Sequence, residues 1–172
     1  MEEVAVESVR ECVNARTHQN KDKESAVARI ESKIFKYDLL ENQILFVRLD
    51  EEDVFPPVLN GLVATQLAEK YKHPTIVARL NDDGMIKGSI RGVSNSEFNN
   101  FRSYLNDTGL FEFVQGHESA AGCAIPEKNL RKLHELANKE LSEYNFTEAS
   151  FPINFSRFAT DSDLAELITD LT

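Results

Sequence analysis

The chain has 172 residues, of which 41% are hydrophobic, and its formal net charge at pH 7 is −10. A chain of this length can bury one hydrophobic core and a flanking element. No apolar run approaches the roughly 20 residues that cross a bilayer, and the acidic start Met1-Glu2-Glu3 is unlike a secretory signal. Two cysteines, Cys12 and Cys123, give no disulfide framework. These features predict a cytoplasmic protein that has no membrane partner.

The acidic surplus lies in the two flanks of the chain. Residues 61–139 carry ten Lys and Arg against nine Asp and Glu, whereas residues 1–60 carry eight against thirteen and residues 140–172 carry one against seven. Non-specific nucleic-acid binders usually present a basic face. The net charge therefore does not exclude nucleic acid as a partner, but it indicates weak affinity for the central segment alone.

Hydrophobic spacing predicts helices and strands that alternate along the first half of the chain. In chain order they are helices over residues 2–14 and 22–37, a strand over 43–49, a helix over 59–71, and strands over 75–80 and 85–91. The sequence Asn81-Asp82-Asp83-Gly84 between the last two strands is a strong signal for a hairpin turn. These two strands are therefore expected to be antiparallel.

The second half continues the same alternation. Its expected elements are a helix over residues 97–105 capped by Ser94, strands over 111–114 and 121–125, a helix over 127–140 with His134 on its exposed side, an extended segment over 147–158 and a short helix over 161–171. Phe98, Phe101 and Tyr104 have helical spacing, which favours core packing over base stacking. The whole pattern predicts an α/β fold, with a mixed sheet of about five strands and helices on both faces.

Two glycine-bounded segments contain the ingredients of a phosphate-binding site. Gly116-His117-Glu118-Ser119-Ala120-Ala121-Gly122 places small residues around a histidine, and Gly88-Ser89-Ile90-Arg91-Gly92 carries a hydroxyl and a guanidinium. Small side chains expose backbone N–H groups, and arginine offers a bidentate fork to an anion. The candidate phosphate-binding residues are Ser89, Arg91, Gly116, His117, Ala120, Ala121 and Gly122.

These residues also have ordinary structural interpretations. His117 can bridge two loops, Arg91 can be a surface residue at a strand end, and Ser89 can simply be a strand residue. Gly116 and Gly122 can serve only to permit a positive φ in a turn. From residue types alone, both interpretations stay open.

The order of these segments resembles the DHHA1 domain of the DHH phosphoesterase superfamily, and most of all the C-terminal half of RecJ-like single-stranded-DNA exonucleases. The resemblance runs over about residues 43–141. It rests on the run Gly61–Tyr71, the Pro-Thr-Ile-Val strand at Pro74–Val77, the Gly-Ser-x-Arg segment at Gly88–Arg91 and the His-x-x-Ala-Ala-Gly loop ending at Gly122. Gln115 stands where the family has the first glycine of a pair.

The resemblance implies that the chemistry resides elsewhere. The family's Asp-His-His tripeptide, which helps to hold two divalent metals, is absent, and the four histidines have no metal-ligand spacing. We therefore expect no cofactor bound by this chain, Mn²⁺ or Mg²⁺ in a separate DHH catalytic domain joined in cis or in trans, and no cleavage by this chain alone. The implied organisation is a helical connector over residues 1–40, the substrate-binding domain over 41–141 and a tail over 142–172.

Three functions remain open from the sequence. The first is the half of a RecJ-like 5′-to-3′ exonuclease that binds single-stranded DNA. The second is the corresponding half of a phosphodiesterase that acts on short oligonucleotides or cyclic dinucleotides. The third is a non-catalytic interaction module with the same fold, which predicts no nucleotide binding.

Overall fold

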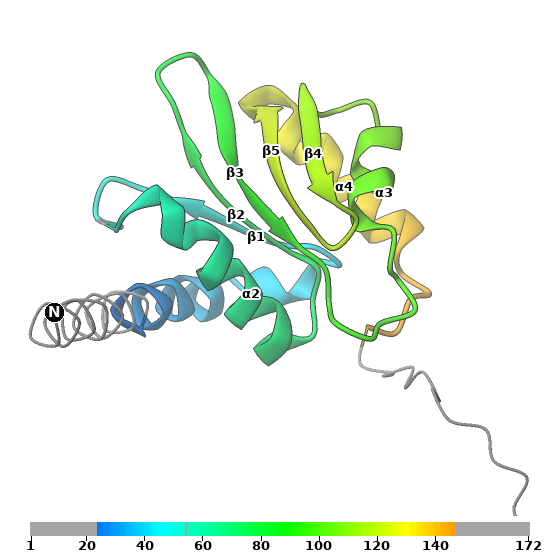
Figure 1. Ribbon diagram of the computed structural model, residues 1–172, viewed down its shortest axis with the longest axis horizontal. Coiled ribbons are helices and arrows are strands. Elements are labelled where there is room, and N and C mark those ends of the chain that lie inside the picture. The colour runs from blue at the N-terminus through cyan, green and yellow to red at the C-terminus, as the bar shows by residue number, and fades with distance from the viewer. Residues whose placement is uncertain (1–23, 54, 147–172) are drawn as a thin grey trace, which may run out of the picture.

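The computed structural model describes residues 24–53 and 55–146. These residues form a five-stranded sheet in the order β1-β2-β3-β5-β4 (Figure 1). The strands are β1 (Leu45–Leu49), β2 (Thr75–Leu80), β3 (Met85–Arg91), β4 (Phe113–His117) and β5 (Ala120–Pro126). β1 pairs with β2 in parallel, and the other pairs are antiparallel. The predicted α/β fold with a mixed sheet of about five strands is confirmed.

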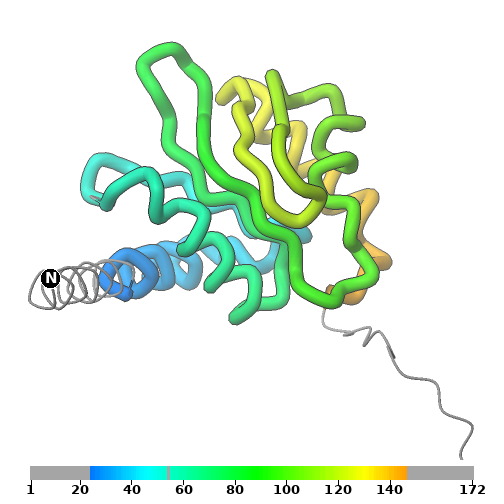
Figure 2. Tube along the Cα trace, viewed as in Figure 1, coloured from blue at the N-terminus to red at the C-terminus, as the bar shows by residue number. Residues whose placement is uncertain are grey.

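Helices cover both faces of this sheet. They are a helix that includes residues 24–36, α2 (Asn60–Tyr71), α3 (Phe101–Asp107) and α4 (Leu130–Glu140), with short 3₁₀ turns η1 (Leu39–Glu41), η2 (Pro57–Leu59) and η3 (Glu127–Asn129). The helix over 24–36 and α2 lie on one face, and α3 and α4 lie on the other (Figure 1). Figure 2 follows the same path and shows the tip of the β2–β3 hairpin projecting beyond the rest of the sheet.

Each face has its own hydrophobic core. Behind the sheet, α3 and α4 pack on a large cluster with Phe46, Ile76, Ile90, Phe101, Val114, Cys123 and Leu133. In front, the helix over 24–36 and α2 pack on a smaller cluster with Ile30, Ile34, Leu45, Val47, Val63, Leu67 and Val77. The smaller cluster takes its strand residues from β1 and β2. α2 lies over β2 and also close to β3.

The second half of the chain differs from the prediction at β4, which runs Phe113–His117 rather than 111–114, and at one helix. α3 begins at Phe101 rather than near Glu97. Ser94 lies in the preceding loop, where its backbone N–H donates to the Glu69 carboxylate, 3.3 Å away. The loop also makes its own local hydrogen bond, from the Phe98 N–H to the Ser96 hydroxyl at 3.2 Å. Such side-chain bonds compete with helix formation, which explains the late start.

The position of His134 also differs from the prediction. Its ring is not on an exposed side of α4 but packs edge-on against Phe46, with 6.0 Å between ring centroids. Burial lowers the pKa of this histidine. Other burial predictions are confirmed: Phe98, Phe101 and Cys123 lie in the core, and burial raises the pKa of the Cys123 thiol to about 12.

Several expectations lie outside the described residues, namely the helix over 2–14, the segments over 147–158 and 161–171, and Cys12. The division at residue 40 stays a prediction. We note that the helix over residues 24–36 belongs to the same core as α2. Within the described residues, no helix has the length and apolar character needed to cross a membrane.

The contribution of this first helix to the core can be tested at Ile30, which is fully buried. Ile30→Ala should lower the free energy of unfolding by about 2–5 kcal/mol, because it removes buried methyl groups and leaves a cavity. Urea unfolding followed by circular dichroism measures the change. Lys36→Ala, at an exposed position of the same helix, is the control and should change stability little. Equal, small effects of both substitutions would contradict the packing.

Candidate phosphate-binding site

The strand register places most of the candidate residues on one open part of the sheet. In the β3–β5 and β4–β5 pairs, Ala120 lies opposite both Arg91 and His117, and Gly122 lies opposite Ser89. Directly opposed residues in antiparallel strands point to the same face. These five residues therefore share one face of the sheet, the front face, on which α2 also lies (Figure 1).

The other two candidates point to the back face. Gly116 and Ala121 oppose each other in register, and the Ala121 side chain is buried in the large core. Gly116 and His117 belong to β4 itself, and the turn is formed by Glu118 and Ser119. On the open face, Gly116 and Ala121 can present only backbone groups.

Arg91 lies at the boundary between the open and the covered part of the front face. Its Nε donates to the Thr65 hydroxyl on α2 at 3.1 Å, and its Nη1 donates to the Ile90 carbonyl at 2.7 Å. A Cβ on Gly61 would lie 2.4 Å from Nη2, so this glycine makes room for the guanidinium on α2. Thr65 thus holds the Arg91 guanidinium by a hydrogen bond, and Gly61 leaves space beside it.

The guanidinium is half-buried and has no carboxylate partner among the described residues. Burial lowers the pKa of Arg91, but an arginine stays protonated in a protein. Its two hydrogen bonds use only part of its five donors. A half-buried cation with free donors and no counter-ion is suited to binding an anion.

His117 faces Arg91 across β5. Two strand spacings separate them, about 10 Å between backbones, which leaves room for a phosphate between the two side chains. The His117 side chain is exposed and forms no hydrogen bond within residues 24–53 and 55–146. Its ring nitrogens are therefore available to a ligand.

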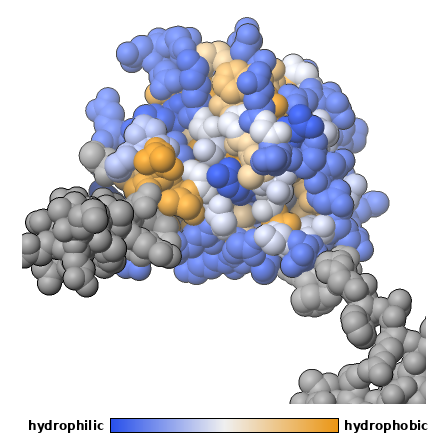
Figure 3. Space-filling model, in the orientation of Figure 1, coloured by the Kyte–Doolittle hydropathy of each residue, from blue (hydrophilic) through white to orange (hydrophobic). Residues whose placement is uncertain are grey.

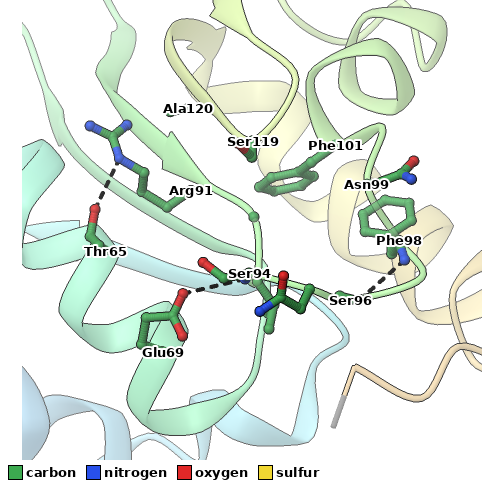
Figure 4. A pocket seen from close by; sticks show the side chains of 13 residues that line it. Thr65, Glu69, Arg91, Ser94, Ser96, Phe98, Asn99, Phe101, Ser119 and Ala120 are labelled. Carbon is green, nitrogen blue, oxygen red and sulfur yellow. Dashed lines mark hydrogen bonds between the residues drawn. The ribbon is translucent and has the colours of Figure 1, made fainter. Parts of the chain in front are cut away.

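A cavity of about 650 Å³ adjoins Arg91 at the end of β3 (Figure 4). Its lining comes from α2, the loop after β3, the start of α3 and the β4–β5 turn, and includes Thr65, Glu69, Ser94, Asn99, Phe101 and Ser119. The Ser94 hydrogen bond and Lys72 hold the pKa of the Glu69 carboxyl below its usual range. No sequence pattern indicated this cavity, because its walls meet only in the folded chain.

Glu118 ties the β4–β5 turn to α3 and was not among the sequence candidates. Its carboxylate accepts hydrogen bonds from the Ser103 backbone N–H at 3.0 Å and the Ser103 hydroxyl at 2.8 Å, and it pairs with Arg102. The Glu118 carbonyl also accepts from the Arg102 N–H at 2.9 Å. The residue beside His117 is thus fixed to a helix on the opposite face.

The described residues contain no group of three or more His, Cys, Asp or Glu side chains that could hold a metal ion.

Gly116 of β4 and Gly122 of β5 should respond differently to substitution by alanine. Gly116 has φ of 140°, and a Cβ there would lie 2.8 Å from the Ala120 carbonyl oxygen. Gly116→Ala should therefore lower the free energy of unfolding by about 1–3 kcal/mol. At Gly122 a Cβ would meet only the Gly88 carbonyl at 3.9 Å, so Gly122→Ala should leave stability nearly unchanged. Urea unfolding of both variants decides this, and equal losses would contradict the geometry.

Glu118 should make stability depend on pH. Chiefly through the Arg102 hydrogen bond, and then through Ser103, its pKa falls from 4.5 to about 2 in the folded chain. The stabilisation is complete above pH 4.5 and is lost as the pH falls toward 2. Glu118→Gln should be less stable than the parent at pH 6, with the difference narrowing by pH 3.

Urea unfolding at both pH values measures this effect. The control is Glu135→Gln on α4, an exposed carboxylate paired with Arg131, which should change stability little at either pH. A Glu118→Gln deficit that stays constant from pH 6 to pH 3 would contradict the assignment.

Comparisons with known proteins point to one group of nucleases. No family model matches the chain. It is 36% identical over 152 residues to "Putative SPbeta prophage-derived single-strand DNA-specific exonuclease YorK" of Bacillus subtilis strain 168, and equally to the YorK protein of Bacillus phage SPbeta. The match covers 87% of this chain and 26% of each relative. The chain thus spans about a quarter of their length.

Two further comparisons agree with this one. The chain is 30% identical over 95 residues to the single-stranded-DNA-specific exonuclease RecJ of Bacillus subtilis, covering 52% of this chain and 12% of RecJ. Crystal structures of RecJ from Thermus thermophilus with Mg²⁺ and with Mn²⁺ superpose with TM-scores of 0.52 and 0.54 at 20% identity. These matches cover 80% of this chain and 20% and 19% of RecJ. The chain is therefore homologous to a part of YorK and RecJ, and it has the fold of a part of RecJ.

Proposed function

We propose that this chain is the substrate-binding part of a RecJ-like 5′-to-3′ single-stranded-DNA exonuclease, with the role of a DHHA1 domain. In this proposal Arg91 and His117 bind a phosphate of the strand across the floor formed by Ala120 and Gly122. Ser89 adds a hydroxyl donor beside them, and Gly116 and Ala121 contribute backbone alone. The observation that carries the proposal is the half-buried Arg91, which has no carboxylate partner in the part of the chain that the structure describes.

Gly122 supports this assignment independently. The fold does not require a glycine there, because a Cβ would project into nearly empty space over the open face. A glycine that the fold does not need is explained by a ligand that comes close to the backbone. Gly122→Ala is thus expected to weaken ligand binding while stability is preserved.

The divalent metals belong, in this proposal, to a catalytic domain outside this chain. The RecJ structures with Mg²⁺ and Mn²⁺ are about five times as long as the part that this chain matches. A two-metal site orients the attacking and leaving oxygens of a phosphodiester. The residues described above would then bind and orient the strand, and cleavage by this chain alone is not expected.

The proposal predicts weak, salt-dependent binding of 5′-phosphorylated oligothymidylate to the full 172-residue chain. Arg91→Ala should reduce the affinity about ten- to a hundredfold, since it removes charge-assisted hydrogen bonds. Arg91→Lys should restore only part of it, because an ammonium lacks the bidentate fork. His117→Ala should also weaken binding with the unfolding midpoint unchanged, because the side chain is exposed. Fluorescence anisotropy gives the affinities.

The matched control is Arg131→Ala, which removes an exposed arginine from α4 on the back face and should leave binding unchanged. NMR shifts on titration should gather at residues 88–92 and 116–122. Binding that is indifferent to Arg91 and His117, or metal-dependent cleavage by the chain alone, would contradict the proposal.

A further inference from the structure

The open face extends beyond the row that contains Arg91 and His117. Register along the same three strands adds two parallel rows, Ser89–Gly122–Gln115 and Lys87–Ala124–Phe113. The middle strand supplies only alanine and glycine to this face, whereas β3 and β4 supply longer side chains. The three rows thus form a trough with a low floor on β5 and higher walls on β3 and β4. We call these nine positions the β5 trough.

The trough is open at one end and closed at the other. Ala120 and Gly122 are partly exposed, whereas Ala124, whose register neighbours are Lys87 and Phe113, is fully buried. Three rows at two-residue steps span about 13 Å, and duplex DNA spaces the phosphates of each strand by about 3.4 Å. Since an unstacked strand is more extended, the trough has room for roughly two to three nucleotides.

Charge in the trough is opposite to the charge of the whole molecule. None of its nine positions is acidic, although the chain has 29 Asp and Glu. Its ionisable residues are Arg91, Lys87 and His117. In Figure 3 side chains of intermediate hydropathy gather in the middle of this face, with a hydrophobic patch on the left and hydrophilic side chains along most of the rim. An anionic, extended chain fits this surface better than a folded acidic protein face does.

Phe113 stands at the closed end of the trough. Its side chain is 38% exposed, whereas the next residue, Val114, is buried in the back core. An aromatic ring on a surface is a stacking platform for any base, which suits binding without sequence preference. Opposite it, Lys87 pairs with Asp83 at 2.7 Å, and both side chains are about half exposed. Such a surface pair is weak, so a phosphate can compete for the ammonium.

We propose that the β5 trough binds a single strand of nucleic acid that runs from Arg91 and His117 to Phe113, where a base stacks on the ring and Lys87 contacts a backbone phosphate. This inference rests on the proposed function, because it takes Arg91 and His117 as the first phosphate site. It adds a second contact site and a path for the strand. It also gives Phe113 a role in binding, which the sequence analysis did not predict.

The test compares a short and a long ligand on the full 172-residue chain. Phe113→Leu should weaken binding of 5′-phosphorylated hexathymidylate about five- to tenfold, because a stacked base is lost. The same variant should bind thymidine 5′-monophosphate as the parent does, since that ligand does not reach the closed end. Phe113→Tyr keeps a ring and should retain the hexamer affinity. Phe35→Leu, an exposed phenylalanine of the helix over 24–36, is the matched control and should have no effect.

Salt dependence tests Lys87 separately. For single strands, log affinity falls against log salt with a slope of about 0.7 for each neutralised phosphate. Lys87→Ala should reduce this slope by about that amount for the hexamer and leave the mononucleotide slope unchanged. If the salt slope for the hexamer is unchanged in Lys87→Ala, Lys87 does not contact a phosphate of the bound strand.

The outcomes separate the two proposals. If Arg91→Ala lowers the affinity for the hexamer but Phe113→Leu does not, the proposed path of the strand along the β5 trough is wrong, and the phosphate site at Arg91 and His117 is retained. If Phe113→Leu weakens hexamer and mononucleotide equally, Phe113 acts on the phosphate site or on folding, and the path is wrong. If the parent chain binds neither ligand, or binds the hexamer independently of Arg91 and His117, the proposed function itself fails.

Discussion

The antiparallel register of β5 with its two neighbours is the constraint on which the site depends. Side chains along a strand alternate between the two faces of the sheet. A shift of the strand pairing by one residue would therefore exchange the front-face side chains with the back-face side chains. Arg91 and His117 would then point into the back core, and Ile90 would point to solvent. The buried partners of the opposite face, above all Ile90 and Cys123, make that exchange costly. Apolar packing behind the sheet therefore fixes the polar arrangement in front.

Partial coverage of the front face has a second consequence. α2 ends the open surface at Arg91 and removes part of the water around the guanidinium, so an anion bound there interacts more strongly than on a fully exposed side chain. On the other side of the site, Glu118 anchors the turn after His117 to α3. The Arg91 side chain is thus oriented by α2 in front of the sheet, and the backbone next to His117 is oriented by α3 behind it.

Sequence patterns predicted β2 and β3 to the residue, because apolar alternation and the Asn81–Gly84 turn are local signals. They also made Arg91 and His117 candidates, through glycines and motif order, and the role of these two residues stays a prediction. They failed where a distant partner decides the outcome. His134 looked exposed on its own helix, but Phe46 of β1 covers it. Glu118 carried no recognisable signal, since Arg102 is distant in sequence and contacts it only after α3 docks.

The acidic chain and its non-acidic trough are compatible because phosphate contacts act over short distances. Salt at physiological concentration screens charges beyond about 8 Å, so the acidic flanks weigh less on a bound phosphate than Arg91 does. Few contacts still imply weak binding by this chain alone. Weak binding is sufficient if the chain is joined to a catalytic domain, as proposed, because a linked site meets the strand at an effective concentration near the millimolar range. In that arrangement, the open face would serve mainly to orient a strand that the rest of the protein holds.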